Sequence, residues 1–261
     1  MPRLRSLRLA LVALATVGAL SAADLVEQTW TIDGVKRTAL VHWPKDAKGP
    51  TPVVFAFHGH GGGSRQASRS FPVHERWPTA IVVYPQGLPT PGKLTDPEGK
   101  RAGWQAEAGV LGDRDLKFFD AMLADLIAHH SADPKRVYAM GHSNGGGFTY
   151  LLWAERGDAL AAVAPSAAVS AKGALKLRPK PAMHLGSPSD ELVKFAWQAR
   201  MIDRVLQVNG CEPRDAAATG KREYASTKGA PVVVYLHDGG HKFPTAATAD
   251  IVAFFQAQGR R

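Results

Sequence analysis

The chain has 261 residues, a single cysteine and a formal net charge of +9 at pH 7. One cysteine excludes an intrachain disulfide, and the basic residues are scattered instead of forming a stripe, which disfavours nucleic-acid binding. The length fits one α/β domain with a large buried core, and no repeat or low-complexity linker indicates a second unit.

The first 23 residues have the pattern of a secretory signal peptide, with a basic start, an apolar run over 9–20 and a small-residue cleavage site at 21–23. The apolar run is shorter than the roughly 20 residues that span a bilayer, so an uncleaved anchor is the weaker interpretation. We therefore predict a signal peptide at 1–23 and a single catalytic domain at 24–261. The protein is expected to be secreted or periplasmic, without stable membrane insertion.

The rest of the sequence predicts a hairpin followed by alternating strands and helices. The hairpin strands, 26–32 and 37–43, alternate polar and apolar residues around Asp33-Gly34. Continuous apolar runs, typical of strands buried on both faces, follow at 52–57, 80–84, 136–140, 160–165, 181–185 and 231–236. Helical patterns separate them at 65–76, 113–130, 144–155, 191–208 and 245–258. This alternation predicts an α/β fold with a mostly parallel central sheet of about eight strands and helices on both faces.

The strand predicted at 136–140 runs into Gly141-His-Ser143-Asn-Gly145, and a helical pattern follows. Glycines at 141 and 145 allow a turn that is too tight for flanking side chains, and the serine between them is held in a strained conformation. This pattern is a nucleophile elbow, which predicts that Ser143 is a nucleophile.

A serine hydroxyl needs a base within hydrogen-bond reach and a third group that orients the base. In a parallel sheet these groups are expected where strands end at the carboxyl edge. His241 follows the last strand in a Gly239-Gly240-His241 loop and is predicted to be the base. The alternatives are that His241 is an ordinary surface histidine, or that His237, directly at the strand end, takes its place.

The predicted orienting acid is Asp190, which closes the segment 186–190 between a strand and a predicted helix. Its alternative role is that of a helix N-cap. Glu191 and then Asp238 are the next candidates for the acid.

The segment His58-Gly-His60-Gly-Gly-Gly63 follows the first strand of the parallel sheet. Ester or amide cleavage develops negative charge on a carbonyl oxygen, and paired backbone N–H groups can stabilise it. We predict that the N–H groups of His60 and Asn144 form this oxyanion hole. A metal site at His58 and His60 is the alternative, but two histidines without a nearby carboxylate are a weak ligand set. We therefore predict no metal and no cofactor.

The long connection over 87–112 is rich in proline and glycine, and such connections often border a binding site. Trp104 is the residue there that is best suited to form an apolar wall for a substrate, and it is predicted to be substrate-binding. Equally, Trp104 could pin the connection to the body of the domain.

These motifs together resemble the secreted α/β-hydrolase esterases of the polyhydroxybutyrate depolymerase and feruloyl esterase (LpqC-like) families. The resemblance rests on residues 58–63, 133–146, 186–190 and 239–244. It implies the α/β-hydrolase fold, a Ser143, Asp190 and His241 triad, and ester hydrolysis through an acyl-enzyme without a cofactor. Lys242 stands where the families more often have an aromatic or small residue, which affects the expected substrate.

We therefore expect a secreted serine carboxylic-ester hydrolase that acts on a small-molecule or polymer-linked ester. A feruloyl or acetyl group on plant polysaccharide is favoured over a crystalline polyester because the chain has no polymer-binding module. The alternatives are a polyhydroxyalkanoate depolymerase, a serine peptidase of the prolyl oligopeptidase type, and a non-catalytic binding protein on the same fold. No sequence pattern predicts an oligomeric state.

Overall fold

The structure is a computed structural model that describes residues 25–45, 49–170, 172–213 and 219–259. The predicted signal peptide, residues 1–23, lies outside the described residues. Among the residues described, no helix is both long enough and apolar enough to cross a membrane.

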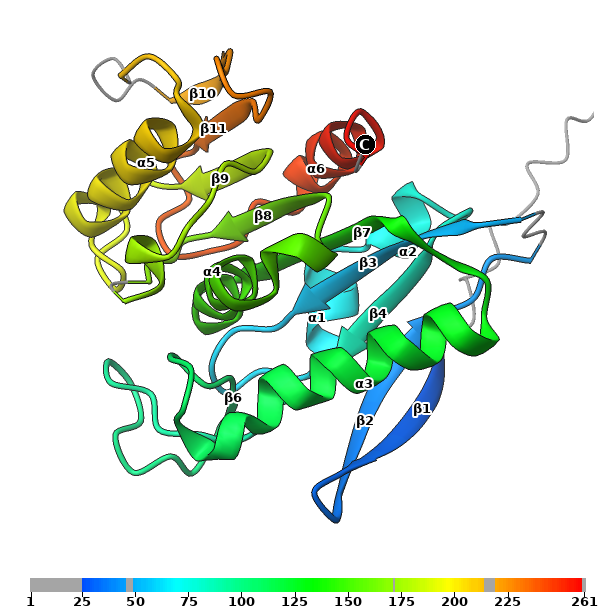
Figure 1. The fold of residues 1–261 in the computed structure, drawn as a ribbon. Coiled ribbons are helices and arrows are strands. Elements are labelled where there is room, and N and C mark those ends of the chain that lie inside the picture. Colours follow the sequence, from blue (N-terminus) through cyan, green and yellow to red (C-terminus); the bar gives the residue numbers. More distant parts are fainter. Residues whose placement is uncertain (1–24, 46–48, 171, 214–218, 260–261) are drawn as a thin grey trace, which may run out of the picture.

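A sheet of nine strands, in the order β1-β2-β4-β3-β7-β8-β9-β11-β10, forms the centre of the molecule (Figure 1). Its strands are β1 (Leu25–Ile32), β2 (Val35–His42), β3 (Thr51–Phe57), β4 (Ile81–Pro85), β7 (Ala132–His142), β8 (Ala162–Ser166), β9 (Ala182–Gly186), β10 (Gly220–Tyr224) and β11 (Val232–Leu236). The pairs from β4 to β11 are parallel, whereas β1 with β2, β2 with β4, and β10 with β11 are antiparallel. The predicted mostly parallel sheet is confirmed.

Two parts of the β structure are not predicted by the sequence pattern. Strand β10 is a polar edge strand with no fully buried residue, so it lacks the apolar run by which the other strands are recognised. Strands β5 (Leu88–Pro89) and β6 (Ala102–Gly103) pair with each other inside the long connection after β4.

Along the chain, the helices alternate with the strands of the sheet. They are α1 (Ser64–Ser70), α2 (Val73–Arg76), α3 (Arg114–His129), α4 (Asn144–Arg156), α5 (Phe195–Asn209) and α6 (Thr248–Gln256), with short 3-10 turns η1 (Leu111–Asp113), η2 (Gly157–Ala159), η3 (Gly173–Leu175) and η4 (Thr245–Ala247). The single helix predicted at 65–76 is in fact α1 and α2, separated at Phe71 and Pro72, because proline cannot donate the backbone hydrogen bond that would continue the first helix.

The helix predicted to begin at 191 begins instead at Phe195. The intervening residues form turns, in which the Asp190 carboxylate accepts hydrogen bonds from the backbone N–H groups of Leu192 and Val193, each at 3.0 Å. These bonds compete with helix formation at the start of the segment.

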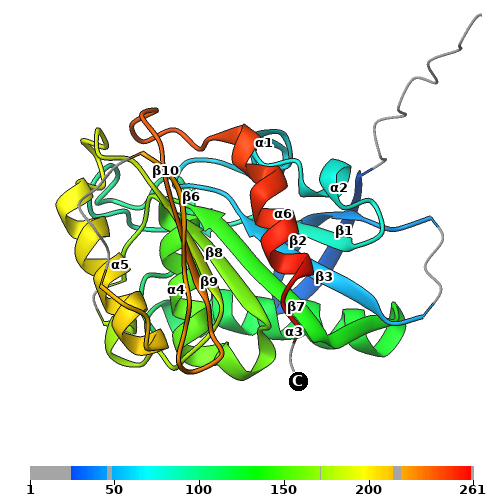
Figure 2. The ribbon, with the colours of Figure 1, turned by 90° about the horizontal axis from the view of Figure 1, so that it is seen from above.

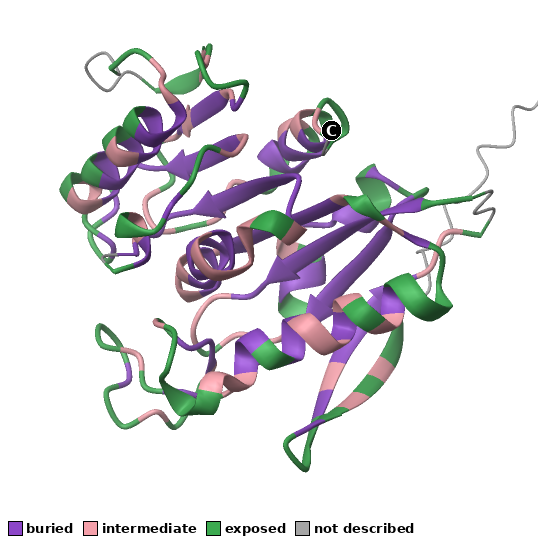
Figure 3. Ribbon diagram, viewed as in Figure 1, coloured by how far each residue is buried: buried purple, intermediate pink, exposed green. Residues whose placement is uncertain are grey.

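Helices cover both faces of the sheet, and each face has its own core (Figures 1 and 2). Because side chains alternate along a strand, Phe55 and Phe57 of β3 pack towards α3 and α4, whereas Val54 and Ala56 belong to the core that includes residues of α1, α2 and α6. Strands β3, β4, β8 and β9 are therefore buried along their whole length, while the β1–β2 hairpin is exposed at its tip (Figure 3). This burial fixes the positions of the strand ends from which the candidate site is built.

Candidate active site

Ser143 lies in the sharp turn between β7 and α4, with φ 56° and ψ −119°. A positive φ at a residue other than glycine is strained and persists only where the surrounding structure enforces it. The enforcing contact is at Gly145, where a Cβ atom would overlap the carbonyl oxygen of Phe57 and lie 2.5 Å from that of His58. A Cβ at Gly141 would likewise lie 2.5 Å from the carbonyl carbon of Gly145. The predicted need for glycine at 141 and 145 is confirmed.

The structure brings the three predicted residues of the triad together. Ser143 Oγ lies 2.9 Å from His241 Nε2, and His241 Nδ1 lies 2.8 Å from Asp190 Oδ2. Because Nδ1 faces a carboxylate, which can only accept, the proton of the neutral imidazole belongs on Nδ1. His241 Nε2 is then free to accept the hydrogen bond of the Ser143 hydroxyl.

The competing candidates occupy other positions. Glu191 and Asp238 are exposed, and within the described ranges neither has a hydrogen bond to His241. His237 Nδ1 accepts a hydrogen bond from the backbone N–H of Gly239 at 3.0 Å, so this histidine shapes the loop that carries His241.

Ser143 and His241 line a cavity of about 420 Å³, within the usual size range of small-molecule sites. Its other lining side chains include the apolar Phe71, Leu192 and Phe243 and the polar Gln66, Ser70, Thr95 and Lys242. The residues that line it include no aspartate and no glutamate. The cavity therefore presents both apolar and polar side chains beside Ser143.

The predicted oxyanion loop passes next to Ser143, since a Cβ atom at Gly59 would lie 3.5 Å from Ser143 Cβ. His60 Nε2 lies 3.1 Å from Asp96 Oδ2, which also accepts the backbone N–H of Arg101 at 2.8 Å. These bonds, that from Arg101 above all, lower the pKa of Asp96 to about 2, so the carboxylate is ionised near neutral pH. The His60 side chain is thereby tethered to the connection that follows β5.

Both ring nitrogens of His58 are engaged within the protein. Nε2 accepts a hydrogen bond from the backbone N–H of Gly87 at 2.9 Å, and Nδ1 lies 2.7 Å from the carbonyl oxygen of Gly59. Burial lowers the pKa of His58, which keeps the ring neutral. The ring thus links the exit of β3 to the connection after β4 and offers no lone pair to a metal.

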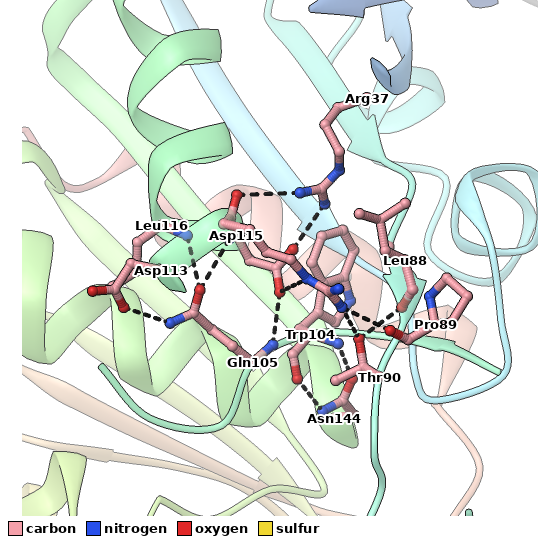
Figure 4. Close-up of polar contacts among 12 residues, drawn as sticks. Arg37, Leu88, Pro89, Thr90, Trp104, Gln105, Asp113, Asp115, Leu116 and Asn144 are labelled. Carbon is pink, nitrogen blue, oxygen red and sulfur yellow. Dashed lines mark hydrogen bonds and ion pairs between the residues drawn. The ribbon is translucent and has the colours of Figure 1, made fainter. Parts of the chain in front are cut away.

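The prediction that Trp104 binds substrate is wrong, because its side chain is 1% exposed and does not line the cavity. Its indole Nε1 donates to the carbonyl oxygen of His58 at 2.9 Å, and its ring stacks on Phe148 with centroids 5.4 Å apart. The Asn144 side chain holds its backbone through Oδ1, which accepts from the Trp104 N–H at 2.7 Å, and Nδ2, which donates to the carbonyl at 3.1 Å (Figure 4). Trp104 therefore pins the long connection to the nucleophile elbow, the alternative role considered for it.

A polar network continues from Trp104 through Gln105 and Asp115 to Arg37 of β2 (Figure 4). The backbone N–H of Gln105 donates to Asp115 Oδ2 at 2.8 Å, and Gln105 Oε1 accepts from the backbone N–H of Asp115 at 3.0 Å. Asp115 Oδ1 accepts from the Arg37 guanidinium at 2.8 Å. Burial lowers the pKa of Arg37, and the adjacent carboxylate opposes this effect. The connection after β4 is therefore fixed at both Trp104 and Gln105.

His142 is a site residue that sequence reasoning missed. Its Nε2 donates to the carbonyl oxygen of His241 at 2.9 Å, and its Nδ1 accepts from the Ser166 hydroxyl at 3.1 Å. Burial lowers the pKa of His142 to about 4, which keeps the ring neutral and allows this division of donor and acceptor. The only signal in the sequence is its place between Gly141 and Ser143, a position that the elbow pattern leaves free.

Gly145→Ala is expected to lower the free energy of unfolding by about 3 kcal/mol or more, because the added methyl group overlaps two backbone carbonyls that cannot move away. The matched control is Gly147→Ala in the same helix, where the Cβ would meet only the carbonyl oxygen of Val169 at 3.5 Å. Urea unfolding of both variants tests this expectation. Equal free energies of unfolding for the two variants would show that Gly145 does not pack against the end of β3 as closely as described.

The pH dependence of stability follows from the buried histidines. His142 stays neutral in the fold down to about pH 4, whereas in the unfolded chain it is protonated below its ordinary pKa of 6.5. The unfolded state binds more protons in this window, so stability rises with pH between about 4 and 6.5 and is lost on acidification. Urea unfolding across this range should give a shallower pH slope for His142→Gln than for the unaltered protein, and identical slopes would contradict the assignment.

Residues 23–168, more than half of the 261-residue chain, match the acetyl xylan esterase (AXE1) family. Feruloyl esterase D of Neurospora crassa is 29% identical over 230 residues, covering 82% of this chain and 76% of that protein.

Two solved structures have the same fold. An acetyl xylan esterase from Aspergillus awamori has a TM-score of 0.65 at 14% identity, covering 88% of this chain and 99% of that one. A ferulic acid esterase has a TM-score of 0.63 at 16% identity, covering 90% and 98%. The predicted α/β-hydrolase fold is confirmed. The chain belongs to the acetyl xylan esterase family and is a carboxylic ester hydrolase.

Proposed function

We propose that the protein is a secreted serine esterase that works through an acyl-enzyme, with Ser143 as nucleophile, His241 as base and then acid, and Asp190 as the group that orients His241. The observation that carries this proposal is the pair of hydrogen bonds at 2.9 Å and 2.8 Å that joins the three side chains. The cavity beside Ser143 supports it, because a substrate carbonyl has room to approach the hydroxyl.

The chemistry has two halves. Ser143 Oγ attacks the ester carbonyl carbon while His241 Nε2 takes the hydroxyl proton, and the tetrahedral intermediate collapses by returning that proton to the leaving alcohol. Water then attacks the acyl-serine in the same way, with His241 again taking a proton and giving it to Ser143 Oγ as the acid leaves. Asp190 stabilises the protonated imidazole in both halves and keeps its Nδ1–H in place.

The oxyanion of each intermediate would be held by the backbone N–H groups of Asn144 and His60. Asn144 is the first residue of α4, where N–H groups have no partner inside the helix and the helix dipole favours negative charge. The loop of His60 runs beside Ser143, as the position of Gly59 indicates. One such donor contributes about 3 kcal/mol to transition-state stabilisation in comparable sites.

For the substrate we propose an uncharged ester with a small or aromatic acyl group, of the acetyl or feruloyl type on a carbohydrate. The mixed apolar and polar lining of the cavity supports this class, as do the feruloyl and acetyl xylan esterases among its relatives. The proposal includes export through the signal peptide at 1–23 and a single catalytic domain over 24–261.

Ser143→Ala is expected to reduce ester turnover by a factor on the order of 10⁶, since it removes the nucleophile. The measurement is hydrolysis of p-nitrophenyl acetate, methyl ferulate, a hydroxybutyrate oligomer and a peptide anilide by both proteins, with fluorophosphonate labelling of Ser143. Ser68→Ala, which removes a hydroxyl of α1 that does not line the cavity and donates to the carbonyl oxygen of Arg65, is expected to retain turnover and labelling.

Other outcomes of this panel would replace the proposal. Preference for the peptide anilide would indicate a peptidase, and preference for the hydroxybutyrate oligomer a polyester depolymerase. No turnover combined with no labelling would indicate a non-catalytic hydrolase-fold protein.

Export has its own test. Expression of the full chain in a bacterial host is expected to yield a processed protein outside the cytoplasm with Asp24 at its N-terminus, determined by mass spectrometry. An unprocessed chain in the cytoplasm would contradict the signal peptide but leave the catalytic proposal intact.

A further inference from the structure

We propose that Gln198 is a positioning residue for the ester-cleaving reaction, held against the Asp190 carboxylate by a buried chain of polar groups from His184 and Tyr150. The inference rests on the proposed catalytic roles of Ser143, His241 and Asp190. Gln198 touches neither the nucleophile nor the cavity, and it acts through the acid.

Gln198 completes the hydrogen bonding of the acid. Its Nε2 donates to Asp190 Oδ2 at 2.9 Å and to the carbonyl oxygen of Val193 at 2.7 Å. The same carboxylate oxygen accepts His241 Nδ1 at 2.8 Å, while Oδ1 accepts the backbone N–H groups of Leu192 and Val193. Since a carboxylate offers about four acceptor directions, all of them are used, and any rotation of Asp190 would break bonds on both oxygens.

Two polar atoms next to this arrangement call for an explanation. Gln198 Oε1 and His184 Nε2 are both buried, and neither has a hydrogen-bond partner within the residues described. They converge on the space above Gly186, where a Cβ atom would lie 2.7 Å from Gln198 Oε1 and 3.5 Å from His184 Nε2. Buried polar groups in native proteins are nearly always paired, so the two atoms are best understood as partners of each other, directly or through one water.

The tautomer of His184 agrees with this pairing. Tyr150 Oη lies 2.6 Å from His184 Nδ1, and both side chains are fully buried. Burial lowers the pKa of His184 to about 4 and raises that of Tyr150, so both are neutral at pH 7. If the tyrosine hydroxyl donates to Nδ1, the imidazole proton belongs on Nε2, facing Gln198 Oε1.

This order of donors fixes which way the Gln198 amide points. A proton on His184 Nε2 attracts the amide oxygen, which leaves the amide NH₂ for Asp190. The opposite orientation would place the amide oxygen of Gln198 against a carboxylate oxygen of Asp190. It would also place the amide NH₂ against the Nε2–H of His184, so that two donors would face each other. Tyr150, His184 and Gln198 therefore form a directed chain that ends at the catalytic acid.

Loss of the Gln198 donor has two consequences for catalysis. Asp190 becomes freer to rotate, so His241 is less well oriented and kcat falls. With one donor fewer, the carboxylate also holds the protonated imidazole of His241 more tightly, so the acidic limb of the kcat/KM profile moves to higher pH.

Titratable groups other than Asp190 also lie near His241, and among the described residues none of them has a hydrogen bond to Gln198. They are His142 at the end of β7, His58 and His60 after β3, and His237, Asp238 and Lys242 on the loop of His241 itself. A shift of the pH profile would therefore report on the bond between Gln198 and Asp190.

The test is Gln198→Met, which keeps the length of the side chain and removes the donor. We expect kcat on p-nitrophenyl acetate to fall about 10- to 100-fold with little change in KM. The acidic limb of kcat/KM is expected to move up by about half a pH unit. The matched control is Gln207→Met in the same helix, whose exposed side chain bonds only Arg204, at 2.9 Å, among the contacts found, and it should leave both quantities unchanged.

Tyr150→Phe is a second variant that removes one oxygen atom and keeps the packing. Without the hydroxyl, the His184 proton can move to Nδ1, and Nε2 then faces Gln198 Oε1 as a second acceptor. We expect a smaller fall in kcat, and a smaller shift of the acidic limb of kcat/KM to higher pH, than in Gln198→Met. This variant decides the question if Gln198→Met fails to fold, as judged by circular dichroism and thermal unfolding.

Each outcome has a distinct meaning. If a folded Gln198→Met protein keeps its kcat and its pH profile while Ser143→Ala is inactive, only the positioning role is overturned. Turnover that survives Ser143→Ala would overturn the proposed function itself. A fall in stability without any shift of the pH profile would assign Gln198 a purely structural role.

Discussion

The contact between Gly145 and the end of β3 is the constraint on which the site depends. With no side chain at this position, the first turn of α4 rests on the carbonyl oxygens of Phe57 and His58. The strained backbone at Ser143 follows from this contact, because the chain must reverse within one residue between β7 and α4. The same approach brings the start of α4 and the loop after β3 close to Ser143, so one backbone contact positions both the proposed nucleophile and the segments that carry the proposed oxyanion donors.

The elbow also organises a segment that has little regular structure. The Asn144 side chain bonds both the N–H and the carbonyl of Trp104. The next residue, Gln105, bonds Asp115, which forms a buried ion pair with Arg37. A buried ion pair contributes little net stability because desolvation offsets the attraction, but removal of one partner leaves a charge without compensation. The network therefore acts mainly to hold the connection after β4 in one position. In this segment hydrogen bonds and the ion pair do what a continuous apolar core does elsewhere.

The three residues of the proposed triad can be recognised in the sequence because each follows the carboxyl end of a strand, and the topology of a parallel sheet brings such ends together. Ser143, Asp190 and His241 need no knowledge of packing to be found. Trp104 was assigned wrongly because its side chain points into the core, and only the tertiary structure shows that. His142 and Gln198 were missed for a related reason: their partners lie on other elements, and no local pattern marks them.

Several histidines of the described chain lie near Ser143, and His241 is the one among them with a hydrogen bond to the Ser143 hydroxyl. His58 and His142 are kept neutral by burial, and each has its ring proton committed to a backbone carbonyl and its other nitrogen to a donor. His241 differs, because its Nδ1 faces a carboxylate and its Nε2 faces the serine. A negative charge beside an imidazole stabilises its protonated form, so the position of Asp190 distinguishes His241, the proposed base, from otherwise similar rings. The buried polar groups behind Asp190 therefore belong to the same arrangement, since they determine where that charge is held.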